Sequence, residues 1–97
     1  MPAFITLFKY TPQGLATIKE SPDRIMTSRA LVEKLGGRII GIWLTMGEYD
    51  LVAVSEAPNA EVAVQVAMMV CGTGTVSSQT MPAFSEEEFA GIVARMP

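Results

Sequence analysis

Four stretches of the chain have the hydrophobic pattern of β-strands. The first, Ala3–Tyr10, is rich in aromatic and β-branched residues and alternates two kinds of side chain, which predicts a strand with two different faces. Arg38–Met46 and Tyr49–Glu56 are strand-like runs on either side of Gly47, which can adopt the positive φ of a tight hairpin turn. Val76–Met81 has the pattern of a short strand. The sequence therefore predicts a central hairpin with one strand before it and one after it.

Three segments carry helix signals. Ser21–Asp23 combines a capping hydroxyl, a proline at the first position and an early acid, and the apolar face that follows ends at Gly36–Gly37. Asn59 can cap a second helix over Ala60–Val70, which is apolar on nearly every side and is expected to be buried from more than one direction. The segment Ser85–Arg95 opens with the spacing of a capping box. A third helix is therefore expected at the C-terminal end.

The order of these elements indicates the fold class. A βαββαβ order with an added C-terminal helix predicts a single α+β domain over residues 1–97, with a ferredoxin-like, four-stranded antiparallel sheet. Two helices in this order pack on one face of the sheet, and the opposite face is left without cover from the same chain. We call this opposite face the open face.

The hairpin register predicts which side chains share each face. With a two-residue or four-residue loop, even positions of one strand pair with odd positions of the other, whereas a three-residue loop would reverse the faces. The predicted core side carries Ile40, Ile42, Leu44, Met46, Tyr49, Leu51 and Ala53. The predicted open side carries Gly41, Trp43, Thr45, Asp50, Val52 and Val54.

The composition favours self-association through the open face. Among the 97 residues, 49% are hydrophobic and only 18% are charged, so a domain this small has more apolar surface than its own core can hide. Trp43, Val52 and Val54, with Phe4 and Phe8 from the first strand, are predicted to cover the corresponding face of a second copy. The expected partner is therefore the chain itself, as a homodimer or a higher oligomer.

Charge and residue usage argue against several other partners. A formal charge of −3 and no basic run make nucleic acid a poor partner. Val62–Cys71, the longest apolar stretch, is too short to cross a membrane. The lone Cys71 cannot form an internal disulfide and no signal peptide opens the chain, so a cytoplasmic location is expected. The sequence contains no histidine, so we expect neither a metal nor another cofactor.

The residues with the most suggestive chemistry lie at the hairpin. Glu48, Tyr49 and Asp50 place a phenol between two acids, a combination that can relay a proton or orient a polar ligand. If the predicted pairing holds, Trp43 and Thr45 add a stacking surface and a hydroxyl close to Asp50. Trp43, Thr45, Tyr49 and Asp50 are therefore the candidate ligand-binding residues. The alternative interpretation is a solvated turn with a tyrosine that caps the core.

The same region carries a resemblance to a known family. Leu44–Val52, with the sequence LTMGEYDLV, resembles the signature region of the bacterial GYD-domain family. Further similarity covers Ser21–Pro22, Gly36–Gly37, Glu56–Pro58 and Ala83–Phe89, so the resemblance extends over nearly the whole chain. It implies a fold of the dimeric α/β-barrel type, and it carries over no catalytic residue. That broader group includes cofactor-independent monooxygenases, lactone isomerases, haem proteins and ligand-sensing domains.

Three functional hypotheses are compatible with the sequence. The leading one is a small-molecule-binding or regulatory homo-oligomer. The first alternative is a cofactor-independent enzyme of the monooxygenase or isomerase type, in which Tyr49 or Asp50 exchanges a proton with a hydrophobic cyclic compound stacked on Trp43. The second alternative is a structural assembly subunit.

Overall fold

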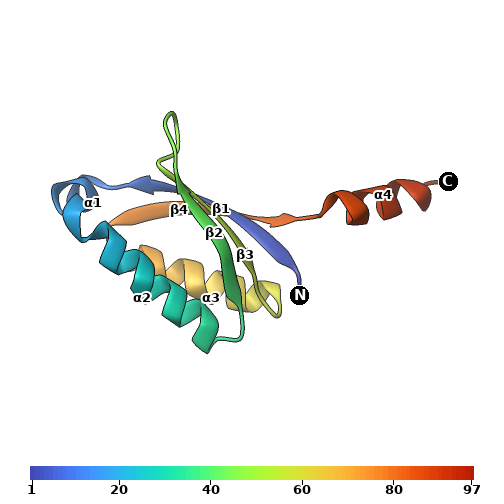
Figure 1. The fold of residues 1–97 in the computed structure, drawn as a ribbon, viewed down its shortest axis with the longest axis horizontal. Coiled ribbons are helices and arrows are strands. Elements are labelled where there is room, and N and C mark those ends of the chain that lie inside the picture. The colour runs from blue at the N-terminus through green and yellow to red at the C-terminus, as the bar shows by residue number, and fades with distance from the viewer.

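The computed structural model describes all residues from 1 to 97 and shows a four-stranded antiparallel sheet with two long helices on one face (Figure 1). The elements are β1 (Ala3–Tyr10), α1 (Pro12–Ala16), a short 3₁₀ turn (Ile18–Glu20), α2 (Ser21–Lys34), β2 (Arg38–Leu44), β3 (Leu51–Glu56), α3 (Ala60–Cys71), β4 (Val76–Ala83) and α4 (Glu86–Ala94). The strand order is β2-β3-β1-β4. The predicted α+β, ferredoxin-like βαββαβ order with an extra C-terminal helix is confirmed.

The helix boundaries follow the predicted caps in two of three cases. The Asn59 side chain accepts a hydrogen bond from the Val62 amide at the start of α3, and Ser85 and Glu88 form a complete capping box at the start of α4. Ser21 differs from the prediction, because Glu20 is the N-cap of α2 and makes no side-chain capping bond. The Ser21 hydroxyl instead lies 2.5 Å from the Tyr10 hydroxyl, inside the domain.

The hairpin register has the predicted parity, although its strands are shorter than expected. Trp43 pairs with Val52 and Leu44 pairs with Leu51, so even positions face odd ones. The strands end at Leu44 and resume at Leu51, and residues 45–50 form an open loop instead of a tight turn at Gly47. This loop projects from the sheet on the side away from α2 and α3 (Figure 1).

Several predicted core positions of the hairpin are wrong. A β-bulge between Ile39 and Gly41 shifts the register, which leaves Ile40 53% exposed. Met46 lies at the loop tip and is fully exposed, and Leu44 is 77% exposed. Ile42, Leu51 and Ala53 do lie on the helix-covered side, as predicted; all three line the same cavity beneath α2 and α3.

Phe4 and Phe8 face the helices, so their predicted position on the open face is wrong. Both line cavities together with residues of α3, and Phe4 is almost fully buried. The alternate positions Ile5 and Leu7 pair with Val54 and Val52, so these two aliphatic side chains occupy the open face. The sequence pattern of β1 could not separate the two sides, because both are apolar.

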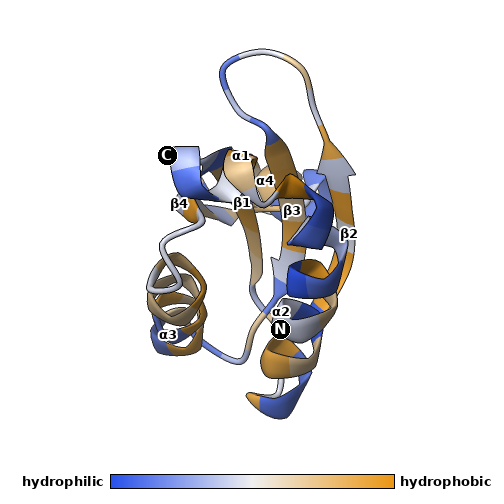
Figure 2. Ribbon diagram, turned by 90° about the vertical axis from the view of Figure 1, so that its left-hand side faces the viewer, coloured by the Kyte–Doolittle hydropathy of each residue, from blue (hydrophilic) through white to orange (hydrophobic).

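The helix layer covers the sheet loosely. Figure 2 shows α3 coloured hydrophobic around most of its circumference, whereas α2 mixes hydrophobic and hydrophilic positions. Val62, Val66 and Val70 of α3 face the sheet, while Met68 and Met69 are 70% and 55% exposed. The expectation that α3 is buried from several directions is therefore wrong for the single chain. The buried apolar core is small and consists of Phe4, Val32, Leu51, Ala53 and Ala57.

Candidate functional site

The loop between β2 and β3 is held in place by hydrogen bonds. The Thr45 amide donates to the Asp50 carbonyl oxygen at 2.8 Å, and the Thr45 hydroxyl donates to the Tyr49 carbonyl oxygen at 2.6 Å. The Asp50 amide donates to the Phe8 carbonyl oxygen at 2.8 Å, and Asp50 Oδ2 accepts from the Tyr10 amide at 2.9 Å. Thr45 and Asp50 therefore connect the loop to the end of β1 and orient its tip.

Tyr49 extends from this loop over the open face. Its hydroxyl donates to Gln79 Oε1 at 3.0 Å, and the Lys9 ammonium lies 5.1 Å from the centroid of its ring. Gln79 pairs with Leu7, which places it on the open face. The predicted position of Tyr49 on the core side is therefore wrong. Because its hydroxyl is bonded to Gln79 and not to Asp50, Tyr49 and Asp50 do not form a proton relay.

Trp43 lies on the open face beside a glycine that makes room for it. A Cβ atom added to Gly41 would lie 2.6 Å from the indole ring, so Gly41 provides the space in which the ring packs. The Trp43 side chain remains 53% exposed. An exposed tryptophan surrounded by aliphatic side chains is a common feature of protein interaction surfaces.

The open face presents a continuous set of apolar side chains across all four strands. Strand pairing aligns Trp43, Val52 and Leu7 in one row that ends at Gln79. The adjacent row runs from Gly41 on β2 to Met81 on β4. The apolar members of both rows are Ile5, Leu7, Trp43, Val52, Val54 and Met81.

The C-terminal helix does not cover the open face. Figure 1 shows α4 at the end of an extended segment, away from the sheet and from α2 and α3. Its exposed apolar side chains recur at helical spacing and form one stripe: Phe89, Ile92 and Val93. The hydrogen bond that the Ser85 amide donates to the Glu88 carboxylate at 3.0 Å, and after it the Ser85 side chain, lower the pKa of Glu88 below its ordinary value. The capping box therefore holds the start of α4 in place.

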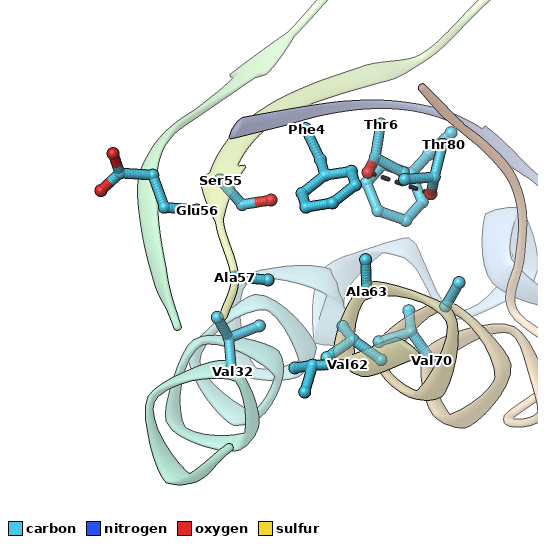
Figure 3. Close-up of a pocket in the computed structure, with 13 residues that line it drawn as sticks. Phe4, Thr6, Val32, Ser55, Glu56, Ala57, Val62, Ala63, Val70 and Thr80 are labelled. Carbon is cyan, nitrogen blue, oxygen red and sulfur yellow. Dashed lines mark hydrogen bonds between the residues drawn. The ribbon is translucent and has the colours of Figure 1, made fainter. Parts of the chain in front are cut away.

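A larger, partly open cavity lies elsewhere, between α2, α3 and the helix-covered side of the sheet. It has a volume of about 230 Å³ and is lined mainly by aliphatic and aromatic side chains. A neighbouring cavity of about 50 Å³ shares part of its wall and is shown in Figure 3, where Phe4 of β1 points toward Val62 and Ala63 of α3.

Polar groups gather at one end of the larger cavity. Tyr10, Ser21 and Thr75 line it where β1 ends, α2 begins and β4 begins, and Ser21 and Thr75 are buried. Arg24 also lines the cavity, and its guanidinium donates to the hydroxyl and the carbonyl oxygen of Thr17 at 2.8 and 2.9 Å. The cavity therefore has a mostly apolar lining with a cluster of polar groups at this end, and Thr6, Ser55 and Ser28 add further hydroxyls along its walls.

The four candidate ligand-binding residues do not line this cavity. Trp43 and Tyr49 lie on the open face, and Thr45 and Asp50 lie at the base of the loop. The sequence does not reveal the cavity, because its walls have the same apolar pattern as an ordinary core. The inward-facing Tyr10 and Ser21, at the junctions of elements, were the one available signal.

Other potentially reactive groups have ordinary surroundings. Cys71 is half-buried, and its Sγ lies 3.1 Å from the Ser78 hydroxyl oxygen. No group of three or more histidine, cysteine or acidic residues converges in a way that could hold a metal ion. None of the helices combines the length and the hydrophobicity that crossing a membrane requires.

Comparison with known proteins supports the fold and the resemblance. The GYD domain model matches residues 4–93. A protein of Thermus thermophilus, the glutamine synthetase and cystathionine β-lyase binding protein, is 30% identical over 97 residues, which cover 99% of each chain. The match is therefore to the full length of that relative.

Two solved structures share the fold at low sequence identity. The leucine response regulatory protein LrpA of Mycobacterium tuberculosis has a TM-score of 0.64 and 12% identity, over 87% of this chain and 51% of the regulator. The chain thus spans about half the length of LrpA. An ACT domain protein from Streptococcus pneumoniae has a TM-score of 0.52 and 16% identity, over 100% of this chain and 98% of that one. These likenesses show a ferredoxin-like fold.

Proposed function

Because the chain belongs to the GYD-domain family, we propose that it is a homo-oligomeric regulatory protein that acts by binding metabolic enzymes. The observation that carries this proposal is the open face, whose apolar rows are not covered by any element of the same chain. Such a surface on a small domain favours association with a second copy. The proposed compartment is the cytoplasm, where metabolic enzymes act.

The relative from Thermus thermophilus supports the choice of partner. That protein is described as binding glutamine synthetase and cystathionine β-lyase, and it matches this chain over its full length. We extend the same kind of partner, an enzyme of amino-acid metabolism, to this chain. The enzyme alternative lacks comparable support, because Trp43, Tyr49 and Asp50 line neither of the two cavities between the helices and the sheet.

The loop over residues 45–50 is the proposed contact with the enzyme. Its backbone is fixed by Thr45 and Asp50, and its tip presents Met46 with the whole side chain exposed. A pre-ordered loop loses little conformational entropy on binding, and an exposed apolar tip supplies area to bury. In this proposal Thr45, Tyr49 and Asp50 shape the enzyme-binding surface and Met46 supplies its apolar area, whereas Trp43 supplies apolar area to the open face between two copies of the chain.

Binding of the purified glutamine synthetase and cystathionine β-lyase from the source organism tests this proposal. We expect at least one of the enzymes to bind the immobilised protein in biolayer interferometry, and we expect Met46→Ser to weaken binding by about tenfold, as burial of one apolar anchor implies. Met26→Ser is the matched control, because Met26 is 69% exposed on α2, away from the loop. Failure of both enzymes to bind, or equal effects of the two variants, would contradict the proposal.

A further inference from the structure

We infer that the cavity between α2, α3 and the sheet binds a small apolar carboxylic acid. The cavity of about 230 Å³ is lined by Phe8, Ile42 and Leu51 from the sheet and by Val66 and Met69 from α3, among other apolar residues. A cavity of about 150 Å³ can hold benzene, so this one has room for about nine or ten non-hydrogen atoms. The inference concerns a different surface from the loop and the open face, and it does not rest on the proposed function.

The polar end of the cavity has one hydrogen-bond donor to spare. The hydroxyl oxygens of Tyr10 and Ser21 lie 2.5 Å apart, and neither makes another hydrogen bond. Two hydroxyls that share one hydrogen bond use only one of their two protons, so the other can be donated to a ligand. The Ser21 side chain is 6% exposed, which makes this donor part of the interior.

The unpaired positive charge of Arg24 indicates that the ligand is an anion. The two ion pairs of the chain join Lys9 to Glu48 and Arg38 to Glu56, so the half-buried guanidinium of Arg24 has no carboxylate partner. Its two hydrogen bonds, both to Thr17, leave other N–H groups free, because a guanidinium carries five. An unpaired cation beside an apolar cavity favours an anionic head group on an apolar body.

The lining also discriminates against free amino acids. The residues around the cavity include no aspartate or glutamate, so the ammonium group of an amino acid would be desolvated without an anionic partner. A carboxylic acid of the same size avoids this cost. The expected ligand class is therefore a monocarboxylic acid with a single ring or a branched aliphatic chain.

Isothermal titration calorimetry on the full chain tests the inference with phenylacetate, benzoate and isovalerate. We expect at least one of these acids to bind and phenylalanine to bind at least about tenfold more weakly. The substitution Arg24→Gln should lower the affinity for the acid by about tenfold and leave the affinity for phenylacetamide unchanged. Arg29→Gln is the charge control, because Arg29 is exposed and donates to the Ile39 carbonyl oxygen.

Filling the cavity provides a second, independent arm. Ala53 is buried and lines the cavity, so Ala53→Leu should abolish binding and leave the protein folded, whereas Ala30→Leu on the exposed side of α2 should change neither. Should Ala53→Leu fail to fold, Ser28→Leu fills the same cavity from α2. Absence of binding by all three acids at millimolar concentration, or binding that survives both the filling variant and Arg24→Gln, would overturn the inference.

Discussion

Asp50 shows how a residue with suggestive chemistry can serve to hold the structure together. Its carboxylate accepts a hydrogen bond from the Tyr10 amide, and its own amide donates to the Phe8 carbonyl oxygen, so it joins the loop to the C-terminal end of β1. The sequence places an acid, a phenol and an acid side by side at this point. The structure sends each of the three to a different partner, because Glu48 pairs with Lys9 and Tyr49 bonds Gln79.

Replacing Asp50 with alanine should therefore destabilise the fold. Asp50→Ala leaves the half-buried Tyr10 amide without its acceptor, and we expect a loss of about 2 kcal/mol in the free energy of unfolding, typical of a hydrogen bond to a charged group. Urea denaturation at a fixed protein concentration measures it. Glu48→Ala is the control, because that exposed ion pair should contribute less than about 1 kcal/mol. Equal losses in both variants would contradict a structural role for Asp50.

Glu88 offers a pH-dependent prediction at the scale of one residue. Hydrogen bonds from Ser85 lower the pKa of Glu88 in the folded helix. A carboxyl with a lowered pKa stabilises the folded helix above its unfolded pKa, and this contribution is lost as pH falls through the folded pKa. NMR titration should find Glu88 below the ordinary value of a glutamate, and Ser85→Ala should raise its pKa. Ser77→Ala, at an exposed position of β4, should leave it unchanged.

At the scale of elements, the sequence predicted the features that local signals specify, above all the ends of the helices. Caps at Asn59 and Ser85 and the glycines after α2 fixed the helix ends, because each satisfies specific backbone groups. No comparable signal in the sequence indicates the bulge at Ile39 or the length of the 45–50 loop. These two features place Ile40, Met46 and Tyr49 away from their predicted side of the sheet. These features depend on how β2 packs against β3 and α2, which a single-strand pattern does not contain.

The position of α4 yields a prediction about the independence of an element. α4 lies away from the sheet and the other helices, so deletion of residues 86–97 should leave β1–β4, α2 and α3 folded. Circular dichroism should lose only the signal of that one helix, and amide NMR shifts of the sheet should be preserved. Val32→Asp is the contrasting variant, because it places a charge in the buried core and should unfold the domain. Unfolding of the truncated chain would contradict this prediction, because it would show that α4 packs against the rest of the same chain.

At the scale of the whole molecule, the apolar surface on two sides of the sheet is larger than one chain can bury. The open face carries Trp43 and five aliphatic or sulfur-containing side chains, and the helix layer on the other side buries few apolar residues. The ferredoxin-like order could be predicted because it follows from the succession of elements. Which of Phe4 and Ile5 faces the helices could not, because that choice depends on pairing with β3 and β4.

The last prediction is that the protein is at least a homodimer formed through the open face. Two such faces packed around a two-fold axis would bury about 800 Å² per partner, which at roughly 25 cal/mol per Å² of apolar area contributes on the order of ten kcal/mol per subunit before association costs. Trp43→Glu would place a charge at the centre of that interface, so sedimentation velocity should show dissociated or unfolded chains. Met68→Glu, at an exposed position of α3 on the opposite side, should leave the oligomer intact. A wild-type protein that sediments as a single monomeric species at micromolar concentration would refute the proposed assembly, since nothing else in the chain covers Trp43 and its neighbours.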